Sequence, residues 1–189
     1  MAEAGGNGAA DGGPGAGVTI IVDGANVVGS RPDGWWRDRA GAAVRLHDKL
    51  ADLAARGQAG IPAAELAASE SPAAGGRGHE PRDDRAEAPG LVPVTVLLVL
   101  EGAARKAVPR IAERARAAEA AGHGENGDHG KNGGVDVVSA PGSGDDEIVR
   151  QAQHLAGHCI VVTADRELRR RCVAAGARVA GPSWLYGLL

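Results

Sequence analysis

VTIIVDGANVVGS, residues 18–30, is a strand-like run that ends at an acid. The five residues before Asp23 are uncharged, and four of them are β-branched aliphatics, which favour a buried strand. Asn26 follows three positions after the acid. Because Asp, Gly and Asn all suit tight backbone geometry, the motif predicts a turn at the end of the strand. A carboxylate followed by an amide also suits a metal site, and the rest of the chain has to decide between these two explanations.

The chain has 189 residues, enough for one domain with a real core. Three segments are poor in large apolar residues: 1–17, 57–90 and 122–134. Such compositions bury too little apolar surface to offset the entropy of ordering the chain, so we expect all three to be disordered or mobile. In residues 57–90 the large aliphatics are Ile61 and Leu66. The sequence therefore predicts a disordered tail over 1–17 and a single domain over 18–189 with two low-complexity inserts.

The remaining segments alternate between strand and helix patterns. Apolar runs predict strands over residues 18–22, 92–100, 135–139, 159–163 and 177–180. Helical patterns cover residues 37–56, 105–121, 145–156, 166–175 and 182–188. The run at 92–100 is continuously apolar, as a parallel strand covered on both faces should be. Regular alternation of this kind predicts an α/β sandwich of three layers around a parallel sheet of four to five strands.

The net charge and the cysteine content indicate which binding partners and which cellular compartment to expect. The net charge is −3, which argues against a wholly basic nucleic-acid binder but not against a nuclease with an acidic centre and a basic rim. The two cysteines, Cys159 and Cys172, lie outside any C-x-x-C spacing, so we expect reduced thiols and a cytoplasmic protein. No apolar run approaches the roughly 20 residues needed to span a bilayer, and no membrane partner is expected.

Motifs for several other α/β functions are missing. GPGAG, residues 13–17, precedes the first strand, whereas a dinucleotide-binding loop follows it. The chain contains neither a G-x-x-x-x-G-K-[ST] loop for phosphates nor a G-x-S-x-G turn for a nucleophilic serine. Nucleotide binding through a glycine-rich loop and nucleophilic catalysis both lose support.

Acids follow the expected strands at the end where an open parallel sheet places its functional residues. They are Asp23, Glu101, the pair Asp145 and Asp146, and Asp165. Taken singly, each has a structural explanation as a helix cap or turn, and Ser143 with Asp146 resembles a capping box. Several carboxylates at one edge repel one another unless a cation lies among them. Mg²⁺ or Mn²⁺ is the natural cation for oxygen ligands, and such ions promote phosphodiester hydrolysis.

The motifs VDGANVV, LLVLEG, PGSGDDEIV and VVTADREL together resemble the NYN branch of the PIN-like ribonucleases. The resemblance covers the expected core and omits the two inserts. It implies a parallel sheet of order 3-2-1-4-5, divalent-metal binding by clustered acids, and cleavage of RNA. Position by position it implies catalytic roles for Asp23, Asn26, Asp145, Asp146 and Asp165. The same four aspartates would bind the metal together with Glu101, while Asn26 would orient Asp23 or a water molecule.

Basic and aromatic residues near the predicted edge suggest how a substrate is held. Arg31, Arg105 and Arg166 lie where they can pair with phosphates. Trp35 and Trp36 suit either base stacking or burial against the sheet in a protein without Phe. The resulting hypothesis is a metal-dependent nuclease acting on single-stranded or structured RNA.

Two other functions compete with this one. A non-catalytic RNA-binding or adaptor module would keep the fold, although the presence of all four expected aspartates counts against a decayed site. A phosphatase-like or receiver-like domain with a phosphorylated Asp23 would want a second acid beside that residue, and Gly24, Ala25 and Asn26 do not supply one.

Overall fold

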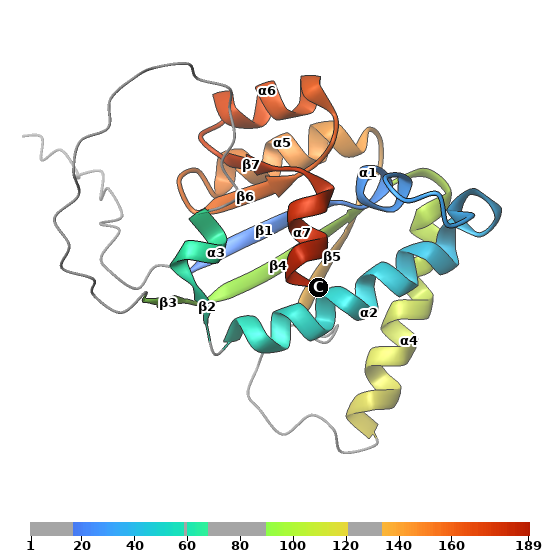
Figure 1. The fold of residues 1–189 in the computed structure, drawn as a ribbon. Coiled ribbons are helices and arrows are strands. Elements are labelled where there is room, and N and C mark those ends of the chain that lie inside the picture. Colours follow the sequence, from blue (N-terminus) through green and yellow to red (C-terminus); the bar gives the residue numbers. More distant parts are fainter. Residues whose placement is uncertain (1–16, 59, 68–89, 121–133) are drawn as a thin grey trace, which may run out of the picture.

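The computed structural model of the chain describes residues 17–58, 60–67, 90–120 and 134–189. Its centre is a parallel sheet whose strands lie in the order β5-β4-β1-β6-β7 (Figure 1). These strands are β1 (Val18–Asp23), β4 (Val94–Leu100), β5 (Val135–Ser139), β6 (Cys159–Val162) and β7 (Arg178–Ala180). Numbered along the chain, they give the order 3-2-1-4-5. The expected sheet and its strand order are confirmed.

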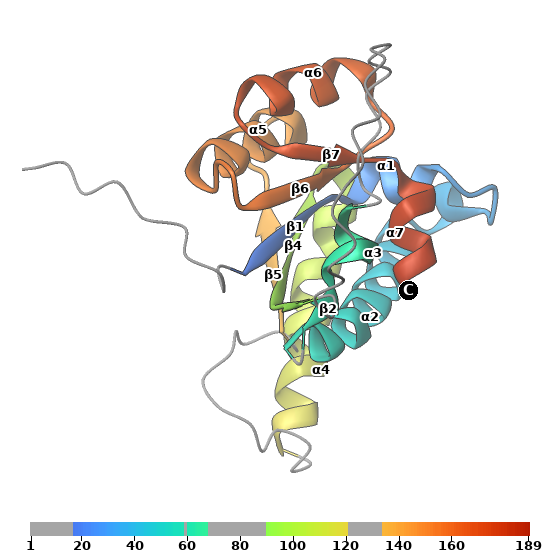
Figure 2. The ribbon, with the colours of Figure 1, turned by 60° about the vertical axis from the view of Figure 1, so that its left-hand side comes forward.

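Helices cover both faces of this sheet, so the domain has three layers (Figures 1 and 2). One face is covered by α5 (Gly144–His154) and α6 (Arg166–Ala174). The other is covered by α2 (Arg39–Gln58), α4 (Ala107–Ala120) and α7 (Pro182–Leu188). Short helices α1 (Gly24–Gly29), η1 (Trp35–Arg37) and η2 (Gly102–Lys106) follow β1 and β4. Among the described residues, no helix is both long and apolar enough to cross a membrane.

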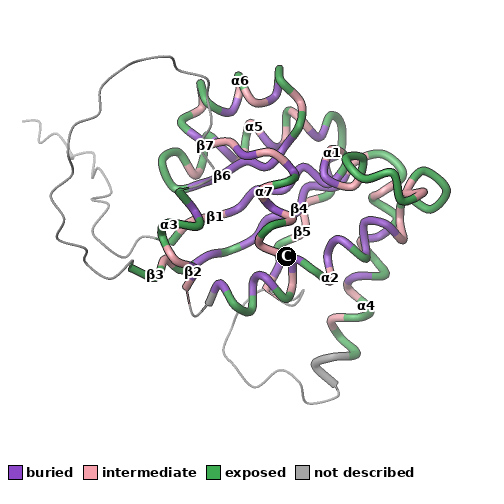
Figure 3. Tube along the Cα trace, viewed as in Figure 1, coloured by how far each residue is buried: buried purple, intermediate pink, exposed green. Residues whose placement is uncertain are grey.

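The central strands are buried on both sides (Figure 3), which explains their continuous apolar sequences. Successive side chains of β1 point to opposite faces. Ile20 packs in the cluster that includes Leu50 of α2, whereas Ile21 packs with Ile148 of α5 and Leu168 of α6. Each layer of helices thus has its own core, and β1 lies between the two.

Part of the segment 57–90, expected to be wholly disordered, is ordered. Residues 60–67 include β2 (Ile61–Pro62) and α3 (Ala63–Ala67), and β2 pairs antiparallel with β3 (Leu91–Val92). The expectation was wrong here because the composition of the whole segment obscures two aliphatic side chains, Ile61 and Leu66, which join the core beside α2. Residues 59 and 68–89 of this insert, the expected tail up to residue 16, and residues 122–133 of the second insert lie outside the described residues.

Candidate active site

The carboxyl ends of the parallel strands meet at one edge of the sheet, which α1 marks in Figure 1. Asp23 is the last residue of β1, and Glu101 comes directly after β4. Asp145 is the second residue of α5, which follows β5, and Asp165 precedes α6, which follows β6. The fold therefore delivers four acids to the same edge from four separate segments.

Asp23 is the most enclosed of these acids, with only 5% of its surface exposed. Its Oδ1 accepts a hydrogen bond from the backbone N–H of Asn26 at 3.1 Å and so caps α1. Its Oδ2 accepts from the Asn26 side-chain amide at 2.7 Å and from the Thr163 hydroxyl at 2.8 Å. Burial raises the pKa of Asp23, these hydrogen bonds oppose the rise, and the charge of Glu101 adds to it.

Gly24 allows the chain to turn directly after this buried acid. A Cβ at position 24 would lie 2.8 Å from the Val99 carbonyl oxygen and 2.9 Å from a methyl carbon of Leu100. Any larger residue would therefore push β1 away from β4 or move the first turn of α1. The turn formed by residues 23–26 places Asn26 where it hydrogen-bonds the Asp23 carboxylate, so the tight turn fixes the position of Asp23.

Thr163 connects two of the acids, and the sequence interpretation did not single it out. Its hydroxyl donates to Asp23 and accepts a hydrogen bond from the Asp165 backbone N–H at 3.1 Å. The Asp165 side chain in turn caps α6 by accepting from the Leu168 N–H at 2.8 Å. The sequence did contain a signal for Thr163, namely a hydroxyl at the end of the buried strand CIVVT. A fully buried polar side chain needs hydrogen-bond partners, so this hydroxyl had to contact other polar groups.

Glu101 caps α5 from a distant part of the chain. Its Oε2 accepts a hydrogen bond from the Gly144 backbone N–H at 2.7 Å. The expected capping box is not formed, since the Ser143 side chain makes no capping hydrogen bond. A Cβ at position 144 would lie 2.8 Å from the same carboxylate oxygen, so glycine is what lets Glu101 approach. A carboxylate is favourable here because the helix N-terminus carries partial positive charge.

The structure separates the neighbouring acids Asp145 and Asp146. Burial raises the pKa of Asp145, and the negative charges of Asp23, Asp165 and Glu101 raise it further, in that order. Asp145 is therefore partly buried and within electrostatic range of the other three acids. Asp146 instead points outward, 72% exposed, and pairs with Arg171 of α6 at 2.5 Å. Of the two residues predicted as metal ligands on α5, only Asp145 lies with the acid cluster, which we define as Asp23, Glu101, Asp145 and Asp165.

The donor set of the acid cluster fits a hydrated divalent ion. Among the described residues, no three acidic, histidine or cysteine side chains are close enough to hold an ion directly. Mg²⁺ commonly keeps several of its waters and binds through one or two carboxylates together with substrate phosphates. Asp23 and Asp145 offer oxygen ligands of this kind, and their raised pKa values show that nearby positive charge would be favourable.

The three arginines predicted to bind substrate lie in different surroundings. Arg31 is exposed, with its guanidinium 3.7 Å from the centre of the Tyr186 ring. Arg105 donates to the Ala140 carbonyl at 3.1 Å, which ties η2 to the loop before α5. Arg166 is exposed at the start of α6. Arg31 is thus the arginine whose orientation is fixed by a side chain, whereas Arg105 contacts backbone.

The tryptophans divide between surface and core. Trp36 is 54% exposed, which rules out its burial against the sheet. Trp35 is partly buried and meets Trp36 edge to face, with ring centres 6.2 Å apart. Trp184 packs against the core beside Leu185, and its indole N–H donates to the Glu65 carbonyl at 3.2 Å.

Comparisons with known proteins support the fold. No family model matches the chain, and no curated protein matches it. A solved structure does match: the crystal structure of Rae1 (YacP) from Bacillus subtilis, in a mutant form. The likeness covers 90% of this chain and 74% of that chain, with a TM-score of 0.51 and 15% sequence identity. This chain has a PIN-like fold. At this identity the likeness shows the shared fold and not a specific family, so the activity has to be argued from the acid cluster.

Proposed function

We propose that this chain is a divalent-metal-dependent ribonuclease that hydrolyses RNA phosphodiester bonds. The observation that carries the proposal is the convergence of the acid cluster at the carboxyl edge of a PIN-like sheet. Burial raises the pKa of Asp145, and the charges of three other carboxylates raise it further, so a cation bound at this edge would relieve their repulsion. A set of helix caps alone would not need to bring these charges together.

The residues of the acid cluster have distinct roles in this proposal. Asn26 and Thr163 fix Asp23 by hydrogen bonds, so its carboxylate is oriented before any ligand arrives. Asp145 and Asp165 lie at the same edge of the sheet, and the three aspartates would hold a hydrated ion mainly through its water molecules. A bound Mg²⁺ or Mn²⁺ would supply positive charge for the phosphate, lower the pKa of water, and stabilise the departing oxygen.

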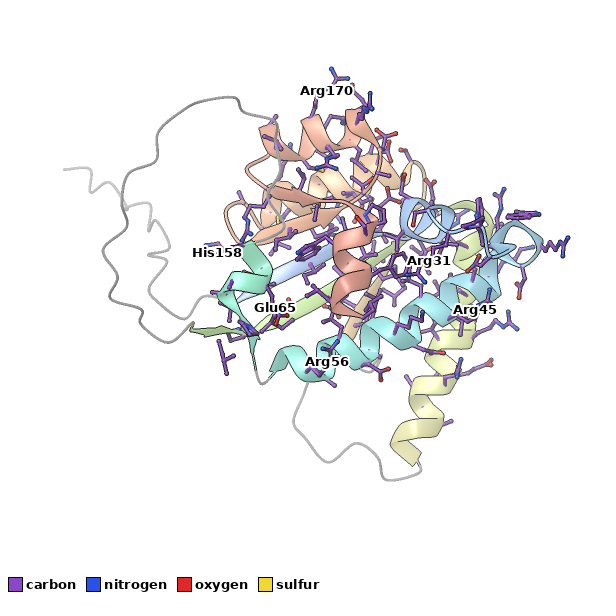
Figure 4. The ribbon with its side chains drawn as sticks, viewed as in Figure 1. Arg31, Arg45, Arg56, Glu65, His158 and Arg170 are labelled. Atoms are coloured by element: carbon purple, nitrogen blue, oxygen red, sulfur yellow. The ribbon has the colours of Figure 1, made fainter. Side chains whose placement is uncertain are left out.

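The position of the histidines favours hydrolysis by water over attack by the ribose 2′-hydroxyl. The latter route usually employs histidine as acid and base. Among the described residues, His47 is buried in α2, and the His154 ring contacts the Arg150 carbonyl within α5. His158 precedes β6, at the opposite edge of the sheet from the acid cluster (Figure 4). We therefore expect products that carry a 5′-phosphate.

The test is incubation of the purified protein with labelled single-stranded RNA, with Mn²⁺ or Mg²⁺ and with EDTA. Asp145→Asn should abolish cleavage. Asp146→Asn is the matched control, since it removes an equal charge one residue away and outside the acid cluster. We expect metal-dependent cleavage that leaves 5′-phosphate ends. A 2′,3′-cyclic phosphate or full activity in EDTA would contradict this mechanism, and RNA binding without cleavage would favour the adaptor function.

A further inference from the structure

A cavity of about 560 Å³ is lined by residues of the loop after β1, the segment after β6 and α7. Its lining includes Ser30, Arg31, Ala164, Ser183 and Tyr186. Ala164 connects the cavity to the cluster, because it stands between Thr163, which is bonded to Asp23, and Asp165. A substrate bound at the acid cluster would therefore have room for a neighbouring group on this side.

A second cavity, of about 200 Å³, adjoins the first at Arg31 and Tyr186, which line both. Its lining also includes Arg45 and Lys49, two exposed residues one turn apart on α2. Figure 4 shows Arg31 and Arg45 on the same side of the molecule. We call the surface formed by Arg31, Arg45, Lys49 and Tyr186 the cationic groove. It leads away from the acid cluster towards α2.

The positive charges of the cationic groove are available to a ligand. Among the described residues, no acid lies within ion-pair distance of Arg31, Arg45 or Lys49. Asp33 is the acid that lines the groove, and its carboxylate accepts a hydrogen bond from the Trp35 N–H at 3.2 Å. The site thus has its negative charge at the sheet edge and its positive charge along the adjoining groove.

Tyr186 gives Arg31 a defined orientation. The guanidinium lies over the ring at 3.7 Å, a distance typical of a cation–π contact. The Tyr186 hydroxyl donates to the Val27 carbonyl at 3.1 Å, so the ring is anchored to α1, which also follows Asp23. With its guanidinium carbon over the ring, Arg31 keeps N–H groups that can donate to the oxygens of a phosphate.

We propose that the cationic groove binds the single-stranded RNA on one side of the phosphate that is cleaved, with Arg31, Arg45 and Lys49 contacting successive phosphates. This inference rests on the proposed ribonuclease function and adds the path of the substrate. Tyr186 acts as a positioning residue for Arg31. Charge complementarity identifies the ligand class, because a polyanion satisfies several unpaired cations in a row.

Binding measured without metal tests the groove independently of cleavage. The measurement is fluorescence anisotropy of a labelled single-stranded RNA of about ten nucleotides in EDTA at several salt concentrations. Arg31→Ala should weaken binding about tenfold, and Arg45→Ala with Lys49→Ala by more. Removal of one side chain that pairs with a phosphate should reduce the slope of log K against log salt by about 0.7. The control is Arg170→Ala, which removes an exposed charge of α6, paired with Glu167, at the far end of the molecule (Figure 4).

A pair of substitutions at Tyr186 tests its positioning role. Tyr186→Phe keeps the ring and should retain most of the affinity, whereas Tyr186→Leu should weaken binding nearly as much as Arg31→Ala. The double variant Arg31→Ala/Tyr186→Leu should then bind no more weakly than Arg31→Ala alone. Unchanged RNA affinity of Arg31→Ala would contradict the proposed role of the cationic groove. So would a loss of affinity in Arg170→Ala equal to that in Arg31→Ala. If RNA binding depends on the groove but no RNA is cleaved, the result would support the proposed binding surface and contradict the proposed ribonuclease activity.

Discussion

At the scale of single residues, the acids of the cluster are held by different contacts. Asp23 accepts three hydrogen bonds, Asp165 caps α6, and Glu101 caps α5. Asp145 differs, because its pKa is governed by burial and neighbouring charges and by no hydrogen bond. Replacing Asp23 by Asn would set an amide donor against the donors of Asn26 or Thr163. Asp145 is therefore the position where the charge can be removed without breaking a hydrogen bond.

We predict that Asp145→Asn stabilises the metal-free protein by roughly 0.5–1 kcal/mol at pH 7, after screening by solvent. The pKa of Asp145 is raised above its ordinary value of 3.8, so the folded state binds this proton more tightly than the unfolded chain. The penalty is thus fully present above the folded pKa and disappears as the pH falls towards 3.8. Urea unfolding at pH 7 and at lower pH should show the advantage of the variant shrinking with acidity.

Asp146→Asn is the control for that measurement, because the same charge is removed where it pairs with Arg171. It should leave the free energy of unfolding unchanged or slightly lower it, with no gain at pH 7. A stabilising Asp146→Asn together with a neutral Asp145→Asn would show that the two side chains have exchanged places.

Asp165 allows its capping role to be separated from its role in the site. Asn is as good a cap as Asp, so Asp165→Asn should keep the bond from the Leu168 N–H and the stability of α6. Asp165→Ala should destabilise the protein by about 1 kcal/mol. Both should lose cleavage activity if the charge serves the metal. An Asp165→Asn protein with full activity would leave Asp165 as a cap alone.

At the scale of elements, the sequence predicts those features that depend on local pattern. The apolar runs at Val18–Asp23 and Val94–Leu100 read correctly as buried strands, since burial on both faces leaves a continuous run. The short elements at 60–67 were missed, because two aliphatic residues show no periodicity. The cap of α5 was also assigned to the wrong residue. Ser143 is adjacent in sequence, whereas Glu101 comes from the end of β4, and no local pattern reports a contact 43 positions apart.

The contact between Glu101 and Gly144 predicts a difference between two substitutions. Glu101→Ala removes the acceptor for the Gly144 N–H and should lower stability by about 1 kcal/mol. It should also lower cleavage, because the first turn of α5 carries Asp145. Glu101→Gln keeps an oxygen acceptor, so it should retain the stability and most of the activity. Thermal unfolding and cleavage rates measured on both variants decide the matter: loss of activity in Glu101→Gln at unchanged stability would make Glu101 a metal ligand instead.

At the scale of the whole molecule, the sequence predicts which edge of the sheet carries the acids but not how their side chains are oriented there. The topology of a parallel sheet brings the residues after β1, β4, β5 and β6 together, which is why acids at strand ends were sufficient to predict that these side chains share one edge. Which of Asp145 and Asp146 faces inward depends on the rotation of α5 against α6. That rotation is set by packing of Ile148 and Leu168 in the shared core, and the sequence of α5 alone does not fix it.

The choice between these two aspartates gives the last prediction, which needs no activity. A ligand that binds only the folded state stabilises it by RT ln(1 + [L]/Kd), about 2.7 kcal/mol at a hundred times Kd. Mn²⁺ or Mg²⁺ should therefore raise the Tm of the wild-type protein, and Asp145→Asn should remove most of that rise. Asp146→Asn should preserve it, because Asp146 pairs with Arg171 and lies outside the acid cluster. A metal-dependent rise that disappears in Asp146→Asn and persists in Asp145→Asn would place the ion on the other side of α5, between α5 and α6.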